Sequence, residues 1–444
     1  MQEVKNSLEE QIKFTVDKFL KESENREIQI ISHFDTDGIT SAVIMIQTLK
    51  KLDRFFSLKI VKSLNEEFIL NLPKDKITFF LDLASSSLNH ITKAKLNNVF
   101  IIDHHEISRE IPKEIAIINP ELYKEKQKIS SAGLTYLFCK EINSENKEFA
   151  KLAVLGMIGD QLENEIDILN NGILDESEIK RKRGLLIYPS TIPLNRTLEY
   201  SSKPYIPGVT GNIKGVLELL RESGLKPENG KYKSLIELNE EEMKKLTTTV
   251  MLRIPKNEKL IGDIFLIKFY NKLEDAREIS SKINACSRLG ESETAIQLCM
   301  ELSEAKKRAE SIHAKYKQLL LSALKFVQES EQIKGEGFTI INARNQIQDT
   351  IIGTIASILS HSVLYKKGTI VTTMAYYENK IKVSARNVGK YGRNVREILS
   401  NVIEKTGGEV GGHKFAAGCI IKQEKENEFI DFLKKQFEIE LIKV

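Results

Sequence analysis

The chain has 444 residues, of which 41% are hydrophobic and 29% charged, a balance typical of a globular protein with two or three domains. Its 66 Lys and Arg residues nearly balance its 62 Asp and Glu residues, and a formal charge of +4 is too small to indicate a nucleic-acid-binding protein by itself. No run approaches the ~18 apolar residues of a membrane span and the first residues show no secretory signal, so we expect a cytoplasmic protein that does not associate with membranes.

Helix and strand patterns alternate through the first 165 residues. Apolar residues at helical spacing predict an amphipathic helix over residues 3–23. Short runs rich in β-branched residues predict strands that begin at Ile28 and recur near residues 57–62, 77–82, 99–103 and 115–118. Helical patterns lie between several of these runs, so we predict an α/β fold with a doubly wound parallel sheet over residues 1–165.

Acids and histidines stand where these apolar runs end. They are Asp103, His104 and His105 after the run at 99–103, His33, Asp35 and Asp37 after the run at Ile28, Asp82 after the run at 77–82, and Asp160 at the end of an apolar helix. Parallel strands end at a common edge of their sheet, and open α/β folds bind ligands there. We therefore expect these side chains to lie together.

Such a cluster would hold four carboxylates and two imidazoles, from Asp35, Asp37, Asp82, Asp160, His33 and His104. Their mutual repulsion is prohibitive without cations, and a mixed oxygen and imidazole shell suits manganese or magnesium better than zinc. We predict two divalent ions, manganese before magnesium, with Asp82 as the acid best suited to bridge them. A bridged pair activates a water and stabilises phosphoryl displacement. In the alternative interpretation, these acids merely end strands at the surface.

Two serines begin the next predicted helix, which runs to about Ile142. Ser130 and Ser131 precede Ala132 and Gly133. Hydroxyls at a helix start usually cap backbone N–H groups, which is the interpretation we favour. The alternative is that they contact a phosphate.

The rest of the chain divides into three predicted parts. Residues 166–300 form an intermediate region of helices and loops, with a solvated basic cluster at 180–183. Residues 301–334 contain a long charged helix that connects two lobes. Residues 335–444 form a smaller α/β domain, with strands near 338–342, 369–374, 380–384 and 414–421 and helices near 349–360 and 393–405.

The ordered set of motifs resembles the DHH phosphoesterase superfamily with its DHH-associated C-terminal domain. It comprises His33 to Gly38, Asp82, Asp103-His104-His105, Asp160 and Gly411-Gly412-His413, so the resemblance covers residues 27–422. Within the superfamily the chain is most similar to RecJ single-strand exonucleases, notably the archaeal GINS-associated nucleases. Asn284 to Gly290 resembles the Asn-Ala…Gly-Arg segment of that branch, with Ser287 where Gly is usual, and Tyr205 to Gly211 resembles the archaeal members.

The resemblance implies a role for each matching residue. One metal is held by His33, Asp35 and Asp82, although bacterial RecJ proteins tend to have an acid in place of His33. The second metal is held by Asp37, Asp82, His104 and Asp160. Asp103 and His105 orient ligands or contact the phosphate in catalysis. The implied substrate-binding residues, some of them across a cleft between the lobes, are Arg288, Ser384, Arg386, Gly411, Gly412 and His413. For the two glycines, a tight turn before a strand is the alternative.

The implied function is a metal-dependent exonuclease that acts on single-stranded DNA or RNA in replication or repair, with GINS-like replication proteins as candidate partners. One alternative is a replication-complex scaffold related to the RecJ-like helicase subunit. The other is a phosphodiesterase for short oligonucleotides or cyclic dinucleotides. An inorganic pyrophosphatase is disfavoured, because Gly411-Gly412-His413 belongs to the nucleotide-acting branch.

Overall fold

The chain divides into two compact units. A computed structural model describes residues 7–107, 110–201, 204–254, 260–362, 364–389 and 392–442. The first unit contains the chain up to Gly184, residues 189–191 and Gly262–His313, and the second contains Leu185–Tyr188, Ile192–Ile261 and the chain from Ala314 onward. The predicted intermediate region 166–300 is therefore divided between the two units.

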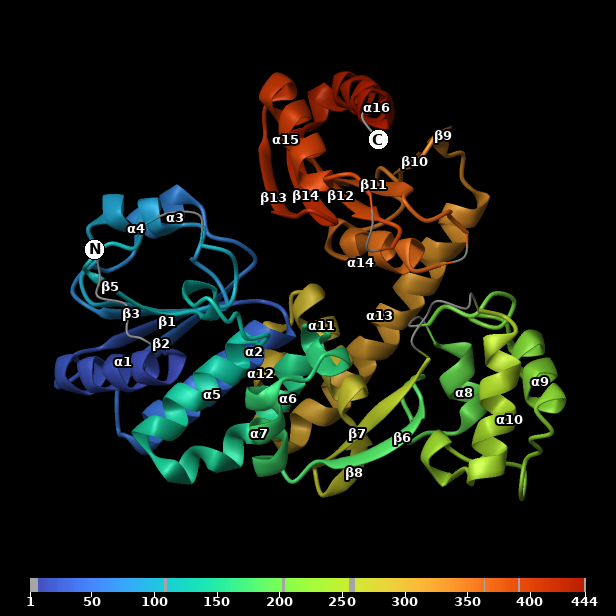
Figure 1. Cartoon of the computed structure of the whole chain (residues 1–444), viewed down its shortest axis with the longest axis horizontal. Coiled ribbons are helices and arrows are strands. Elements are labelled where there is room, and N and C mark those ends of the chain that lie inside the picture. Colours follow the sequence, from blue (N-terminus) through green and yellow to red (C-terminus); the bar gives the residue numbers. More distant parts are fainter. Residues whose placement is uncertain are drawn as a thin grey trace. The chain divides into compact units, whose positions relative to one another are not determined.

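A five-stranded parallel sheet forms the centre of the first unit (Figure 1). Its order is β2-β1-β3-β4-β5, with the bounds β1 Ile28–His33, β2 Phe56–Val61, β3 Ile77–Leu81, β4 Val99–Ile102 and β5 Ile115–Ile118. The central strands β3 and β4 are buried along their whole length, which explains their continuous apolar runs. The predicted parallel sheet is thus confirmed.

Helices cover both faces of this sheet. One hydrophobic core lies between the sheet and α1 (Leu8–Glu22), α2 (Thr36–Lys51), α5 (Ser131–Ile142) and α6 (Ala150–Gly159). The other face packs against the shorter α3 (Glu66–Leu70) and α4 (Leu88–Ala94). All five strands run in one direction, so their C-terminal ends meet at one edge.

The remainder of the first unit contains a second sheet that the sequence analysis missed. It has the order β6-β7-β8, with β6 Lys180–Leu185, β7 Ile261–Phe269 and β8 Lys272–Asp275. The basic cluster at 180–183 is mostly exposed, as expected, but it lies on an edge strand and not in a loop. The unit is completed by α7 (Ile168–Glu176), α11 (Ala276–Arg288), α12 (Ser292–Cys299) and the first turns of α13 (Ser303–Glu329).

The second unit contains a helical segment and a mixed sheet. The helices are α8 (Leu194–Glu199), α9 (Ile213–Glu222) and α10 (Glu240–Met251). The sheet has the order β13-β14-β12-β11-β10-β9 and is antiparallel except for the pair β10 and β11. Its strands are β9 Ile333–Gly335, β10 Phe338–Asn342, β11 Ile370–Tyr377, β12 Lys380–Asn387, β13 Glu409–His413 and β14 Ala416–Lys422.

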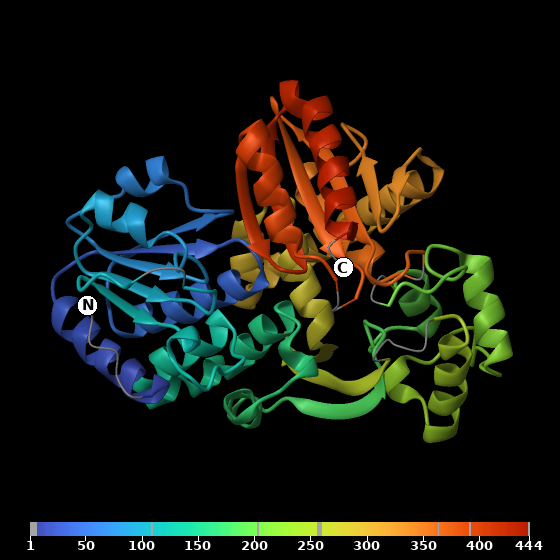
Figure 2. The same ribbon diagram turned by 45° about the horizontal axis from the view of Figure 1, so that its top comes forward.

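Three helices pack on this sheet. The helices α15 (Val395–Thr406) and α16 (Glu426–Ile442) lie beside one another and build the core on one face (Figures 1 and 2). The helix α14 (Asp349–Ser360) lies against β11 and β12. A single strand is predicted near 414–421, whereas the structure forms the hairpin β13–β14. The low strand propensity of Gly411 and Gly412 hides β13 in the sequence.

Among the residues that the structure describes, every helix is too short or too polar to span a bilayer.

Candidate metal centre

The turn between β1 and α2 brings three predicted ligands together. His33 ends β1, and Asp35 caps α2 by accepting a hydrogen bond from the backbone N–H of Gly38 at 3.0 Å. A Cβ atom at Gly38 would lie 2.2 Å from the carbonyl oxygen of His33, so only glycine lets this turn close. The turn therefore fixes the spacing of His33, Asp35 and Asp37.

Asp37 is fully buried and is held by the start of α5. Its carboxylate accepts hydrogen bonds from the backbone N–H groups of Ser131 at 2.7 Å and Ala132 at 2.9 Å. Gly156 on α6 makes room for it, because a Cβ atom there would lie 2.5 Å from Asp37 Oδ1. Burial against a helix N-terminus thus orients this carboxylate before any ion binds.

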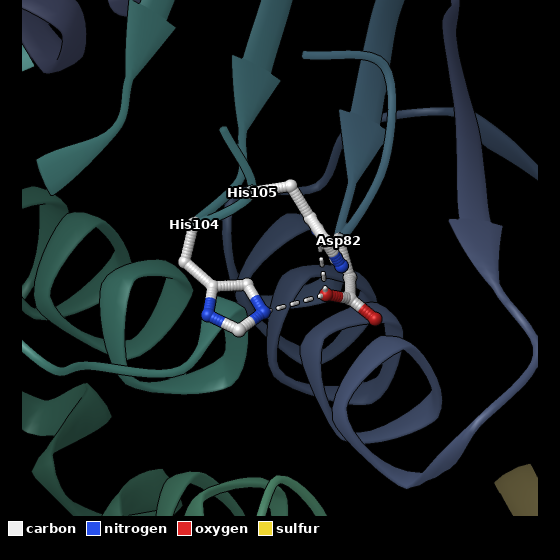
Figure 3. A group of neighbouring side chains, drawn as sticks. All are labelled: Asp82, His104 and His105. Atoms are coloured by element: carbon white, nitrogen blue, oxygen red, sulfur yellow. Dashed lines mark ion pairs between the residues drawn. The ribbon is translucent and has the colours of Figure 1, made fainter. Parts of the chain in front are cut away.

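Asp82 lies between two groups of ligands. It directly follows β3, is 2% exposed and has a left-handed backbone with φ of +61°. Its Oδ2 lies 3.1 Å from His33 Nδ1, and its Oδ1 lies 3.5 Å from His104 Nε2. Figure 3 shows its carboxylate beside the rings of His104 and His105. A non-glycine residue in this backbone region is strained, and such strain is concentrated at functional sites.

The two serines at the start of α5 have different roles. Ser130 caps the helix through Gly133, as expected. The Ser131 hydroxyl instead donates to Asp82 Oδ1 at 3.0 Å, which neither the capping nor the phosphate interpretation anticipates. Only the position of Ser131 at a helix start hinted at a role in the site.

The residues after β4 complete the cluster. His104 Nε2 lies 3.2 Å from Asp160 Oδ2 and 4.0 Å from Asp37 Oδ2. Asp103 is fully buried, and its Oδ1 accepts from the backbone N–H groups of His104 and His105 and lies 2.7 Å from His105 Nδ1. Asp103 therefore shapes the turn and orients the His105 ring.

The electrostatics of the cluster favour bound positive charge. Burial raises the pKa of Asp37 to about 7, and the charge of Asp82 adds to the rise. Burial and Asp37 together raise the pKa of Asp160 well above its ordinary value. Burial also acts to raise the pKa of Asp82, but hydrogen bonds from His104 and His33 hold it well below its usual range.

Burial by itself lowers the pKa of an imidazole, but the pKa values of the two histidines in this cluster are raised. Burial acts to lower the pKa of His33, but Asp35 and Asp82 raise it well above its ordinary value. The pKa of His104 is likewise raised well above its ordinary value by Asp82 and Asp160, against the effect of burial. The site thus retains protons that neutralise its carboxylates, and divalent cations can replace them.

Within the part of the chain that the structure describes, three sets of side chains bring potential ligand atoms within 4.8 Å of one another. They are His33 with Asp35 and Asp82, Asp37 with His104 and Asp160, and Asp82 with His104 and His105. The first two sets contain all six side chains expected in the cluster, and Asp82 contacts both. Carboxylate oxygens and imidazole nitrogens in this arrangement fit manganese or magnesium.

Of the predicted substrate-binding residues, Arg288 lies in the same unit as this cluster. Its guanidinium carbon is 5.7 Å from the centre of the Phe34 ring, and its Nε donates to Asn284 Oδ1 at 3.1 Å. Phe34 stands between His33 and Asp35, so Arg288 borders the metal-binding turn.

Four of the other predicted substrate-binding residues share one face of the second unit's sheet, namely Ser384, Arg386, Gly411 and His413, whereas Gly412 has a register position on the opposite face. Arg386, Ala416 and His413 are opposite one another on three neighbouring strands, and Ser384, Gly418 and Gly411 are opposite one another two positions away. Side chains two apart on a strand share a face. The structure therefore places Arg386 and His413 on one face, with small residues between them.

This surface, which we call the glycine face, is bordered by α14. Arg386 Nε donates to Ser357 Oγ on that helix at 3.3 Å, and Nη1 donates to the carbonyl oxygens of Ala385 and Ala417. Gly412 has a φ of +118°, so its backbone conformation explains the glycine. A Cβ atom at Gly411 would meet nothing within 4 Å, so packing does not require glycine there.

A parallel α/β domain with acids and histidines at its strand ends, followed by a domain with a Gly-Gly-His strand, is the architecture of a DHH protein. Residues 27–157 match the N-terminal domain of the DHH family, residues 337–438 match the DHHA1 domain, and residues 188–260 match the DHH-CID domain.

Two curated relatives match most of the chain. An uncharacterized protein of Methanocaldococcus jannaschii is 28% identical over 422 residues, which are 91% of either chain. The single-stranded-DNA-specific exonuclease RecJ of Bacillus subtilis is 25% identical over 426 residues, which are 90% of this chain and 44% of that protein. The chain thus spans less than half the length of the Bacillus protein.

Solved structures share the fold. RecJ of Thermus thermophilus in complex with Mn²⁺ superposes with a TM-score of 0.59 and 18% identity, covering 96% of this chain and 54% of that one. CDC45 of Entamoeba histolytica superposes with a TM-score of 0.69 and 13% identity, covering 96% of this chain and 99% of that one. The chain belongs to the DHH superfamily and is a RecJ-like member of it.

Proposed function

We propose that this protein is a metal-dependent exonuclease that hydrolyses phosphodiester bonds of single-stranded DNA or RNA, with a role in DNA replication or repair. The observation that carries the proposal is the pair of ligand sets joined by Asp82, in which each carboxylate and imidazole expected in the cluster is present. The similarity to a protein named single-stranded-DNA-specific exonuclease supports the substrate class.

We assign His33, Asp35 and Asp82 to one ion and Asp37, Asp82, His104 and Asp160 to a second. When bound, such ions lower the pKa of a water and neutralise charge on the phosphoryl oxygens. The fixed orientation of Asp37 by α5 and of Asp82 by Ser131 means that the ligands need little rearrangement to bind them.

His105 is not assigned to either ion, and it is our candidate for contact with the reacting phosphate. Its side chain is 42% exposed, and Asp103 holds its Nδ1. Although burial acts to lower the pKa of His105, Asp103 raises it above the ordinary value, so the ring is more often protonated near neutral pH. A protonated ring can hydrogen-bond a phosphate oxygen or donate a proton to the leaving oxygen.

Five cationic or small residues are assigned to the rest of the substrate. Arg288, beside Phe34, is positioned to neutralise a phosphate near the ligand turn. On the glycine face, Arg386 and His413 supply donors, and Gly411 lets a phosphate approach the backbone. Ser384 shares this face and is 5% exposed.

The direct test is digestion of single strands of DNA and RNA, labelled at the 5′ or 3′ end, with manganese and with chelator. We expect shortening from one end, dependence on manganese, and resistance of duplexes. A replication scaffold with a GINS-like partner would leave all strands intact, whereas a short-oligonucleotide or cyclic-dinucleotide phosphodiesterase would cut only the smallest substrates.

Circular single strands separate an exonuclease from an endonuclease, because they contain phosphodiesters but no end. We expect circles to survive under conditions that degrade linear strands of the same sequence. Cutting of circles at the rate of linear strands would overturn the exonuclease proposal while leaving metal-dependent hydrolysis intact.

A further inference from the structure

The helix α11 contacts the metal-binding turn at both residues that are not assigned as ligands. The turn reads His33-Phe34-Asp35-Thr36-Asp37. The Thr36 hydroxyl donates to the carbonyl oxygen of Ser280 on α11 at 3.0 Å, and Arg288 at the end of α11 lies over the Phe34 ring. The two residues that separate the ligands are thus both fixed by one helix that is distant in sequence.

Thr36 is tightly enclosed. It is 3% exposed and is the first residue of α2. Its own carbonyl oxygen accepts from Thr40 Oγ1 at 2.8 Å, and a Cβ atom at Gly159 on α6 would lie 2.8 Å from Thr36 Cβ. Because Asp35 and Asp37 are its chain neighbours, a displacement of Thr36 moves both carboxylates.

α11 is in turn held by a buried polar cluster. His313 on α13 is 3% exposed, and its Nδ1 lies 3.2 Å from Glu278 Oε1 while its Nε2 lies 3.0 Å from Ser281 Oγ. Glu278 and Ser281 flank Ser280, whose carbonyl receives the Thr36 hydroxyl. Both ring nitrogens therefore fix the segment of α11 that contacts the turn.

We propose that Thr36 is a positioning residue for the metal centre, and that the anchor formed by Glu278, His313 and Ser281 acts through α11 on Thr36. The hydroxyl–carbonyl bond sets where Asp35 and Asp37 lie, and thereby tunes metal affinity. The inference rests on the proposed metal binding and names the residues that regulate its strength.

The test compares Thr36→Val, Thr36→Ser and Thr48→Val in the full chain. Valine keeps the shape of threonine and removes only the hydrogen bond, and serine keeps the hydroxyl. Thr48 is the matched control, because it is equally buried in α2 but donates to the carbonyl oxygen of Ile44 in its own helix. Manganese binding is measured by calorimetry, and kcat and KM are measured on a single-stranded substrate.

We expect Thr36→Val to weaken manganese binding by about 10- to 100-fold and to lower kcat with little change in KM. Thr36→Ser should stay within a few-fold of wild type, and Thr48→Val should match wild type while its melting temperature falls about as much as that of Thr36→Val. Wild-type manganese affinity in Thr36→Val, or equal losses in the serine and valine variants, would overturn the inference.

Failure of the proposed function looks different: wild-type protein would bind manganese without degrading single strands, and the manganese affinities of the variants would still test the role of Thr36.

The role of the anchor is tested by a double-mutant cycle between Thr36→Val and Ser281→Ala. Ser281→Ala removes the contact to His313 Nε2 and leaves the imidazole ring of His313 in the protein. If the anchor acts through Thr36, the two losses of manganese affinity are not additive. Additive losses would show that the anchor acts elsewhere and would overturn this part of the proposal.

Discussion

The metal centre and the glycine face are built in opposite ways. Asp37, Asp82 and Asp103 are buried and receive hydrogen bonds from backbone N–H groups or hydroxyls, whereas His413 and Gly411 are exposed on an edge strand. Buried carboxylates are costly, so they persist only where partners orient them. The metal centre is therefore fixed by buried partners, whereas the glycine face is open to solvent at its edge strand.

The largest effect is expected at Asp82. Asp82→Asn keeps the shape and tolerates the left-handed backbone but weakens both ligand sets, so we expect hydrolysis to fall about a thousandfold or more, which corresponds to a loss of about 4 kcal/mol in transition-state stabilisation. Asp82→Ala should be equally inactive, and circular dichroism should show a folded protein in both cases.

Asp53→Asn is the matched control, because Asp53 is exposed and also has a left-handed backbone, with φ of +53°. It should keep wild-type activity. Activity of Asp82→Ala within a few-fold of wild type would refute the two-metal interpretation.

The packing around the metal centre can be disturbed by a substitution that leaves every proposed ligand in place. In Gly156→Ala the new Cβ atom would lie 2.5 Å from Asp37 Oδ1 and 2.5 Å from Ala132 Cβ. We expect a loss of about 1–3 kcal/mol in the free energy of unfolding and weaker manganese binding. Gly172→Ala on α7 is the control, since nothing lies within 4 Å, and it should be neutral or slightly stabilising. Indistinguishable manganese affinities in the two variants would contradict the close packing.

Substitution of the charged residues on the glycine face should weaken substrate binding and leave manganese binding unchanged. His413→Ala and Arg386→Lys are expected to raise KM by about tenfold, because lysine cannot reproduce a bidentate guanidinium contact. Calorimetry should show unchanged manganese affinity. Loss of manganese binding in His413→Ala would contradict the separation between the two regions.

The two neighbouring glycines of β13, Gly411 on the glycine face and Gly412 on the opposite face, should respond differently to alanine. Gly411→Ala adds a methyl group in open space, so we expect unchanged stability and a few-fold higher KM. Gly412→Ala introduces a side chain at φ of +118° and 2.5 Å from the carbonyl oxygen of Ala416, which should cost about 1–3 kcal/mol of stability. Denaturant unfolding distinguishes them, and a destabilised Gly411→Ala would mean that glycine is needed there for folding.

The smallest expected effect is a pH dependence of the stabilisation by metal. In the metal-free centre burial raises the pKa of Asp37 to about 7, and the pKa values of Asp160, His33 and His104 lie well above their ordinary values. The folded state therefore binds more protons than the unfolded state from about pH 6 to about pH 8, so the metal-free protein loses stability as pH rises.

Metal replaces these protons, so we expect the gain in melting temperature on adding manganese to grow by several degrees across that range. Melting curves with and without manganese measure it. A gain that shrinks as pH rises would show that the folded centre does not hold these protons.

The sequence by itself determined where the ligand-bearing side chains stand along the chain. Asp82, Asp103 and His33 follow apolar runs, and parallel strands end at one edge, so their convergence follows from periodicity and sheet geometry. The grouping of His33 with Asp35 and of Asp160 with His104 came from the resemblance, and the structure brings these side chains together.

Only the tertiary structure decided what holds those side chains in place. The contacts of Ser131 with Asp82 and of Thr36 with Ser280 join residues 49 and 244 positions apart. No local pattern marks a serine or threonine hydroxyl for a distant partner, because the same residue types cap helices and line surfaces elsewhere. The strand β6 was missed for a related reason. Its four basic residues carry no apolar alternation, and pairing with β7, which is distant in sequence, makes them a strand.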